Sequence, residues 1–514
     1  MDNHGKIMKG LWVVLLLTYI FIFGVIFNYD SASFSDEKLV SHAWILADGK
    51  GWHWKDFGTF LDTEAIELSG DRLSRPVSNF MEVLNAKFRA NCWNFIPPHP
   101  SLSIMWLISL FILPYFLFKF FRNMGCAPPI AFVGSCWYIA SLGCLSPLVM
   151  LFHPAKGLVN FFGVLVLFIG SKFYAQWVQK PGPSSLADIP HGRCWAAGLF
   201  ACLVLALFSD ETGLFIYPMA IVLFIPALFW RFKERWLLIG GMLSLPVLYG
   251  IALRWALPAL HHWRSGHMGD DLRNFVSYPH IKDLFFPNFH NLGTNFYWLL
   301  GDHPHVRFNI FDFLPYPHLF VIQVLYNIAM AIVVYAFVRN FNFKRVRLIA
   351  LCMLLIVFFV FFHTFQLSNN AKVWGVWWYG SLFSLLYGLA LTFILQHAWE
   401  GEKTLVLRRS LVFIFAIMAC HSLVFGTYRY NYFNGLPEPS VGHPFIPTDT
   451  LQYRNFSFLE SARLARCKYL YVTHQWAEAR HKLFTNIPET DACTQELRQD
   501  KIFMLQSRYL YLEL

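Results

Sequence analysis

The sequence predicts an all-α, polytopic membrane protein with about eleven transmembrane helices. The first observation behind this fold class is composition: of 514 residues, 56% are hydrophobic and only 14% are charged, whereas soluble domains carry about a quarter charged residues. An aromatic content of 18% suits a lipid-facing surface with aromatic side chains at the headgroups. The second observation is that the net charge of +10 is spread over short segments between apolar stretches. No basic run is long enough for a nucleic-acid-binding arm, so membrane lipids rather than nucleic acid are the expected surroundings.

The individual spans follow from the requirement for about 20 mostly apolar residues to cross a bilayer. The first stretch has no Ala-x-Ala-like cleavage site after it, so we expect it to remain as a span rather than to be removed as a signal peptide. The expected spans are 11–28, 102–121, 130–151, 158–178, 194–208, 214–230, 236–258, 318–338, 348–366, 375–397 and 410–427.

Charge predicts which side each connection occupies. Every second connection is short and basic, as the positive-inside rule requires of cytoplasmic loops, and the N-terminus falls on the same side. The C-terminus is then extracytoplasmic. The basic residues of these connections are Lys6, Lys9, Lys119, Arg122, Lys172, Lys180, Arg193, Arg231, Lys233, Arg235, Arg339, Lys344, Arg345, Arg347, Lys403, Arg408 and Arg409.

Two units follow from this topology. Residues 1–427 form the transmembrane domain, with long extracytoplasmic loops at 29–101 and 259–317, and residues 428–514 form a small extracytoplasmic C-terminal domain. Cys467 and Cys493 lie in that second domain, where a disulfide and two free thiols are equally consistent with the sequence.

The first extracytoplasmic loop opens with an acidic pair, Asp36-Glu37, directly after Ser35. One interpretation is a carboxylate that faces a cleft between spans and acts as a general base or a metal ligand. The other is helix capping by Ser35, with acids in the first turn favouring the helix dipole. Later in the loop an amphipathic, interfacial helix is expected to begin at Pro76. Its apolar face is predicted to comprise Val77, Phe80, Met81, Leu84 and Phe88.

The short extracytoplasmic loops each place polar groups near the membrane plane. Asp210-Glu211 follows Ser209 between two apolar stretches, and Lys156 and Lys372 lie in two other short loops. Together they are expected to line one cavity, with acids on one side and lysines on the other, where a lysine can bind phosphate. The alternatives are capping by Ser209 and snorkelling of each lysine to the interface.

This layout resembles the GT-C superfamily of multi-spanning glycosyltransferases, although the motifs do not identify a subfamily. Three features carry the resemblance: a cytoplasmic N-terminus followed by a long external loop opened by Asp36-Glu37, a C-terminal extracytoplasmic domain after roughly eleven to thirteen spans, and a span that begins at an acidic turn, Ser209-Asp210-Glu211-Thr212-Gly213. The turn is similar to the Lys-Glu-Thr turn of some family members, with Asp210 where they have lysine.

The resemblance implies an inverting glycosyltransferase that moves a sugar from a polyprenyl-phosphate-linked donor to a lipid, glycan or protein acceptor on the extracytoplasmic face. Asp36 matches the position of the family's catalytic base, with Glu37 as the substitute. Asp210 or Glu211 would orient the acceptor or hold a metal. Some family members need a divalent metal such as Mg²⁺ or Mn²⁺ and others do not, and the sequence leaves this open. Depth and charge alone make Lys156, Lys372 and Arg307 the candidates for binding the donor phosphate.

Two other functions fit parts of the pattern. A polymerase or ligase of surface polysaccharide would use Arg and His residues of loop 259–317 instead of Asp36. A flippase or transporter of lipid-linked sugars would place charges and helix breaks in the middle of spans. Here the acids cluster at span ends, while Pro114, Pro218, Pro226 and Pro246 interrupt apolar stretches.

Overall fold

The computed structural model describes residues 104–139, 154–179, 184–229, 232–252, 317–339, 348–357, 381–401 and 408–414, together with separate residues within 12–20 and 75–84. Within these ranges the chain forms helices and turns and no strand, which confirms the all-α prediction for this part of the protein. The second extracytoplasmic loop and the C-terminal domain predicted at 428–514 lie outside the described residues.

Each expected span that the structure describes coincides with helix. The shift at the ends is a few residues, which is the usual scatter of helix boundaries. The principal elements are α6 (Ile104–Leu107), the π-helix η3 (Ile108–Ile112), α7 (Leu113–Asn123), α8 (Pro128–Ile139), α10 (Pro154–Gln179), η4 (Leu186–Asp188), α11 (Gly192–Leu207), η5 (Glu211–Phe215), α12 (Ile216–Phe229), α13 (Arg235–Ile251), α18 (Pro317–Arg339) and α20 (Ser381–Gly401).

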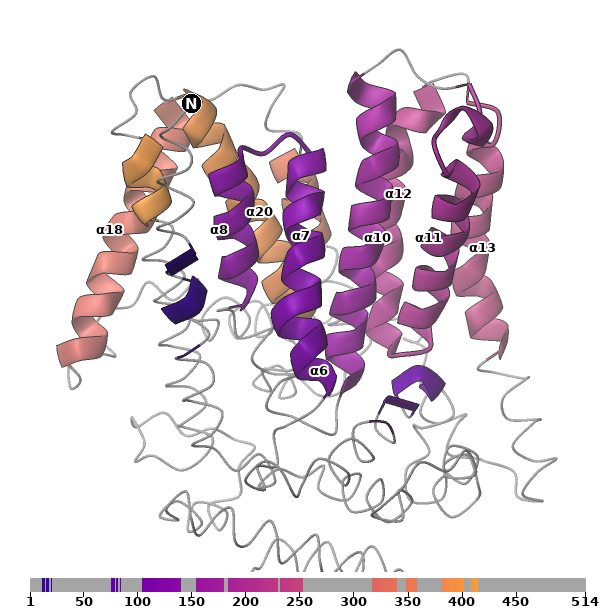
Figure 1. Ribbon diagram of the computed structural model, residues 1–514, viewed down its shortest axis with the longest axis horizontal. Coiled ribbons are helices and arrows are strands. Elements are labelled where there is room, and N and C mark those ends of the chain that lie inside the picture. Colours follow the sequence, from indigo (N-terminus) through magenta and orange to yellow (C-terminus); the bar gives the residue numbers. More distant parts are fainter. Residues whose placement is uncertain are drawn as a thin grey trace, which may run out of the picture.

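Helix α10 lies at the centre of the bundle. It packs against α7, α11, α12 and α20, while α13 packs on α11 and α12 and α18 packs on α20. Helices α7, α8, α10, α11, α12 and α13 run in alternating directions (Figure 1). The connections 124–127, 184–191 and 232–234 therefore lie at one end of the bundle, called the basic end below, and the turn 208–210 lies at the opposite end, called the Asp210 end.

The prolines that interrupt the apolar stretches do not break the helices. Pro218 and Pro226 lie within α12 and Pro246 lies within α13. Pro114 is the second residue of α7 and lies two residues after Ile112, where the π-helical turn η3 ends. Because proline removes one backbone donor and its ring clashes with the carbonyl four residues earlier, a wider turn before it relieves the clash and lets α6, η3 and α7 continue as one rod.

Small residues allow the helices to approach closely. A Cβ added to Gly163 or Gly170 of α10 would meet Ile216 and Leu223 of α12 at 3.1 and 2.7 Å. Helices α8 and α20 meet in the same way, because Gly388 lies under the ring of Trp137, which is fully buried. Close contact at small residues is the usual means of association between helices that have lipid around them.

Replacing Gly388 with alanine is expected to lower the free energy of unfolding by about 1–3 kcal/mol, the usual effect of overpacking a filled core. The new Cβ would lie 2.6 Å from the Trp137 ring, which has no free space to move into. Gly240→Ala is the matched control, because a Cβ there meets nothing within 4 Å and alanine has the higher helix propensity. Thermal unfolding of both variants in detergent measures the difference, and equal midpoints would contradict it.

Large apolar side chains are exposed on the outer helices. Among the described helices, one is both long enough and apolar enough to cross a membrane, Ala155–Trp177. Shorter apolar helices include Gly192–Leu207 and Arg235–Ile251. The eleven-span count therefore remains a prediction. The exposed apolar residues of α13 are Trp236, Leu237, Leu243, Val247, Leu248 and Ile251, and those of α18 are Val321, Leu325, Ile328, Ile332, Val334, Tyr335 and Val338.

The basic end is built by short, well-bonded connections. The side chain of Ser185 caps η4 and forms a capping box with Asp188, whose carboxylate also accepts a hydrogen bond from the Ser184 hydroxyl at 2.6 Å. This hydrogen bond and those from the neighbouring backbone lower the pKa of Asp188. Glu234 accepts a hydrogen bond from the Leu186 amide, which joins the connection before α11 to the start of α13.

The segment expected to be helical after Pro76 is helical at the described residues 76–78, 80, 81 and 84. Val77 and Met81 pack against the core as expected. Phe80, predicted on the same face, is 46% exposed, whereas Ser78 is buried.

Candidate functional site

The turn between α11 and η5 is held by side chains that bind its own backbone. The Ser209 hydroxyl donates back to the Leu205 carbonyl at 2.7 Å. Asp210 is the N-cap of η5, and its Oδ1 accepts hydrogen bonds from the Thr212 amide at 2.9 Å and the Thr212 hydroxyl at 2.6 Å. The expectation that Ser209 caps this turn is therefore wrong: Asp210 does so, since the shorter serine side chain is already engaged with the preceding helix.

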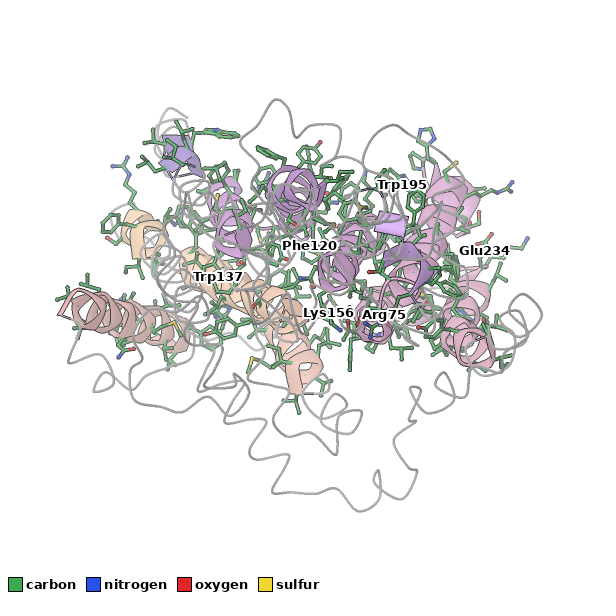
Figure 2. All side chains as sticks on the ribbon, turned by 90° about the horizontal axis from the view of Figure 1, so that it is seen from below. Arg75, Phe120, Trp137, Lys156, Trp195 and Glu234 are labelled. Carbon is green, nitrogen blue, oxygen red and sulfur yellow. The ribbon has the colours of Figure 1, made fainter. Side chains whose placement is uncertain are left out.

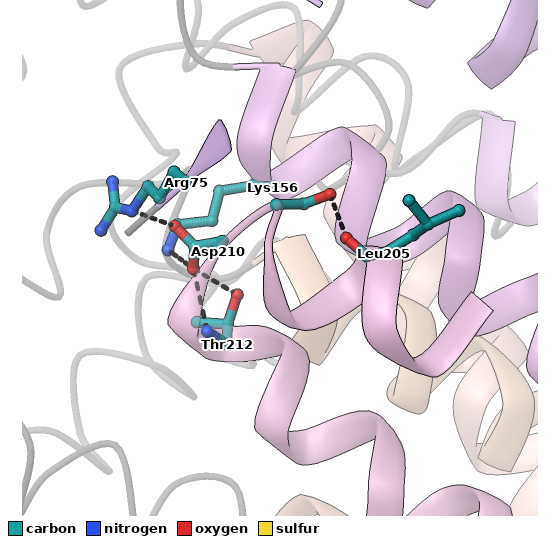
Figure 3. Close-up of polar contacts among 6 residues, drawn as sticks. Arg75, Lys156, Leu205, Asp210 and Thr212 are labelled. Atoms are coloured by element: carbon teal, nitrogen blue, oxygen red, sulfur yellow. Dashed lines mark hydrogen bonds and ion pairs between the residues drawn. The ribbon is translucent and has the colours of Figure 1, made fainter. Parts of the chain in front are cut away.

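Lys156 pairs directly with Asp210. It lies in the first turn of α10, and its Nζ donates to Asp210 Oδ1 at 2.5 Å (Figure 3). The side chain of Lys156 is 10% exposed and that of Asp210 is fully buried. The expectation that acids and lysines gather in one place is confirmed for this pair, but they touch instead of facing each other across a cavity. Snorkelling does not describe Lys156, because its ammonium is buried and paired.

Arg75 is the second cation at Asp210, and sequence reasoning missed it. Its Nε lies 3.3 Å from Asp210 Oδ2, and its side chain is 18% exposed. Figure 2, which looks onto the Asp210 end of the bundle, shows Arg75 and Lys156 side by side. The one local signal is its place before Pro76, since a residue before proline is held extended and its side chain is set off from the following helix.

The two cations determine the charge state of Asp210. Burial alone raises the pKa of a carboxyl group, but the charges of Lys156 and Arg75 and the hydrogen bonds from Lys156 and Thr212 outweigh it, so that the pKa of Asp210 is well below its usual range. A carboxylate this stable as an anion is a poor general base. Among the described side chains, Lys156 and Arg75 therefore bring two positive charges to the one carboxylate of Asp210.

The cluster continues into the bundle along α10. Asn160, one turn after Lys156, is fully buried and donates to the Tyr138 hydroxyl of α8 at 2.8 Å. Residues four apart lie on the same helix face, so Lys156 and Asn160 present their polar groups on one side of α10. The described polar groups at this end thus connect α8, α10 and the turn at Asp210.

Gly213 sets the shape of this turn. A Cβ at this position would lie 2.4 Å from the Ala206 carbonyl oxygen, and the clash is with backbone rather than with a movable side chain. We expect Gly213→Ala to open the turn and to lower the free energy of unfolding by about 1–3 kcal/mol. Gly198→Ala is the matched control, because its nearest contact is an ordinary 3.6 Å to Ile169. Unfolding midpoints in detergent measure the effect, and a neutral Gly213→Ala would show that the turn tolerates the shift.

The other predicted site residues are not brought together by the described structure. Asp36, Glu37, Lys372 and Arg307 lie outside the described residues, as do Cys467 and Cys493. Glu211 is described only in its backbone, as the first residue of η5.

A metal site at Asp210 does not fit these surroundings. Among the described residues, no group of three His, Cys, Asp or Glu side chains could hold a metal ion. Asp210 also carries three hydrogen bonds on Oδ1 and an arginine at Oδ2. Two cationic side chains already neutralise it, and a divalent cation would have to displace them.

Comparisons with protein-family models, with curated proteins and with solved structures gave no match to this chain.

Proposed function

We propose that this chain is an integral membrane enzyme of the GT-C type, an inverting glycosyltransferase that moves a sugar from a polyprenyl-phosphate-linked donor to an acceptor on the extracytoplasmic face. In this proposal Asp36 takes the proton of the acceptor hydroxyl. The acceptor oxygen then attacks the anomeric carbon, and the bond from that carbon to the donor phosphate breaks with the electron pair leaving on the phosphate. Inversion follows because attack and departure occur on opposite faces of the sugar.

The observation that carries the proposal is the cluster of Lys156, Arg75 and Asp210 at one end of a helical bundle. Two cationic side chains that are nearly buried suit the leaving phosphate of a lipid-linked donor, because charge stabilisation is strongest where water is excluded. Asp210 takes neither the role of base nor that of metal ligand here. Its low pKa and its bonds make it the group that holds Lys156 in place.

The arrangement of the remaining charges supports the membrane part of the proposal. Arg122 lies in the last turn of α7, and Arg193 and Arg235 lie at the starts of α11 and α13, all at the basic end. The positive-inside rule would place this end in the cytoplasm. Exposed apolar side chains on α13 and α18 suit contact with lipid tails. The Asp210 end would then face the extracytoplasmic side, where lipid-linked donors are used.

The test is transfer of a labelled sugar from a synthetic polyprenyl-phosphate donor by the purified full-length protein in detergent, with and without a metal chelator. Product with inverted anomeric configuration supports the proposal, and the chelator lane decides metal dependence. If folded protein transfers sugar from none of the polyprenyl-phosphate donors tried, the proposed function is overturned and a polymerase or a flippase is favoured.

A further inference from the structure

The described residues within 75–84, which belong to the predicted first extracytoplasmic loop, contact the bundle near the end of α11. The Val77 amide donates to the Phe208 carbonyl at 3.1 Å, at the end of α11. Ser78 is buried, and Val77 and Met81 pack against the hydrophobic core. The helical segment that contains them lies below the end of α11 in Figure 1.

The two oxygens of Asp210 serve different parts of the chain. Oδ1 binds Lys156 of α10 and the amide and hydroxyl of Thr212, all of which belong to the bundle. Oδ2 faces Arg75, which belongs to the docked loop segment (Figure 3). One buried carboxylate therefore joins the loop segment to two elements of the bundle, next to the Val77–Phe208 hydrogen bond.

We propose that the Arg75–Asp210 ion pair is a docking contact that holds the first extracytoplasmic loop on the bundle, and that Arg75 is a positioning residue for the reaction. The reaction part of this inference rests on the proposed function. Asp36, the proposed base, lies earlier in the same predicted loop. A segment fastened beside Lys156 holds Arg75 at a constant place relative to the cation that would meet the donor phosphate. Positional errors of about 1 Å are enough to lower catalysis by about 100-fold.

The variant that tests the contact is Arg75→Gln, because it removes the charge on the loop side and leaves the Lys156–Asp210 pair intact. Amide hydrogen exchange of peptides that contain Val77 reports opening of the docked segment directly and needs no substrate. Losing one partner of a mostly buried ion pair should raise the exchange rate of this segment by about tenfold or more. Arg193→Gln is the matched control, since Arg193 is exposed at the basic end.

The positioning role is tested by restoring the connection with a different bond. Val77→Cys and Phe208→Cys, introduced together, would place two thiols where the backbones already touch. In the Arg75→Gln protein, transfer from the polyprenyl-phosphate donor should have a lowered kcat with little change in KM, and oxidation to the disulfide should restore kcat. The reduced form of the same triple variant is the comparison. Mass spectrometry of the linked peptide confirms that the disulfide joins the two introduced cysteines rather than a native one.

The results separate the alternatives. An unchanged exchange rate of the Val77 peptides in Arg75→Gln would overturn the docking contact. A raised KM that the disulfide does not correct would overturn the positioning role and assign Arg75 to the donor phosphate instead. A wild-type protein that transfers no sugar would overturn the proposed function and the positioning role with it, while the exchange rates would still decide whether Arg75 docks the loop.

Discussion

Asp210→Asn is expected to lower the free energy of unfolding by about 3–5 kcal/mol, the usual result of removing one partner from a buried ion pair. Asparagine keeps the side-chain oxygen that accepts from Thr212, so the cap of η5 survives and the loss isolates the charge. In the variant the side chains of Lys156 and Arg75, 10% and 18% exposed, remain close together without the carboxylate charge that both contact in the wild type. Thermal unfolding of the purified protein in detergent measures the loss.

Two control variants test whether the loss of stability comes from the buried ion pair. The double variant Lys156→Met/Asp210→Asn removes both members of the pair and should recover most of the stability, because an apolar side chain of similar length replaces the stranded cation. Arg193→Gln changes an exposed charge at the basic end and should have a small effect. If the double variant were less stable than Asp210→Asn, the pair would not be the source of the effect.

The same ion pair predicts a pH profile. The pKa of Asp210 is lower in the folded protein than in the unfolded chain, where aspartate titrates near about 4. Its contribution to stability is therefore fully present above about pH 4 and is lost as the pH falls towards the folded pKa. The difference in stability between wild type and Asp210→Asn should be flat from about pH 5 to 8 and should shrink only in stronger acid.

Asp36→Asn is expected to lower sugar transfer by roughly 10²–10⁴-fold, the range by which a positioned base accelerates proton transfer. Asparagine has nearly the same shape but cannot accept the acceptor's proton. The measurement is the initial rate of transfer from a synthetic polyprenyl-phosphate sugar, with donor binding and unfolding midpoint recorded on the same protein. Both of these should stay near wild type, so that the loss lies in the chemical step.

Glu37→Gln is the matched control for this variant, because it changes the neighbouring carboxylate in the same way. Equal rates for wild type and Asp36→Asn, with a large loss in Glu37→Gln, would move the base by one residue. Full activity in both single variants would show that the catalytic base does not belong to this loop. Asp210 would be a weak replacement, since two cations hold its pKa low. A polymerase or a flippase would keep most of its activity in Asp36→Asn.

The helices were predictable because they depend on local composition. Apolar stretches such as 158–178 and 318–338 coincide with α10 and α18 within a few residues. Pro226 and Pro246 seemed able to break their spans, yet both helices continue through them. Neighbouring helices in a bundle support a backbone that has lost one hydrogen bond, and a local sequence pattern carries no information about those neighbours.

The candidate site was predictable only in part, because its contacts join residues far apart in the chain. The short loops suggested that Asp210 and Lys156 lie on one side, but their direct pairing depends on how α10 packs beside α11 and α12. Arg75 joins them from another segment, and its place before Pro76 is the one local feature that sets it apart from the other arginines. Ser209 and Asp210 were both able to cap the turn, and the preceding carbonyl of Leu205 decided between them.

The close approach of α10 to α12 also fixes where the charges meet. Lys156, Gly163 and Gly170 recur at every seventh position of α10, as Ile216 and Leu223 do along α12. Seven residues make two turns to within about 20°, so the lysine stands at the end of the stripe that carries the two glycine contacts. Removing one residue between Lys156 and Gly163 would rotate the lysine by about 100° around the helix axis and away from Asp210. The register of α10 against α12 therefore determines whether Lys156 meets Asp210.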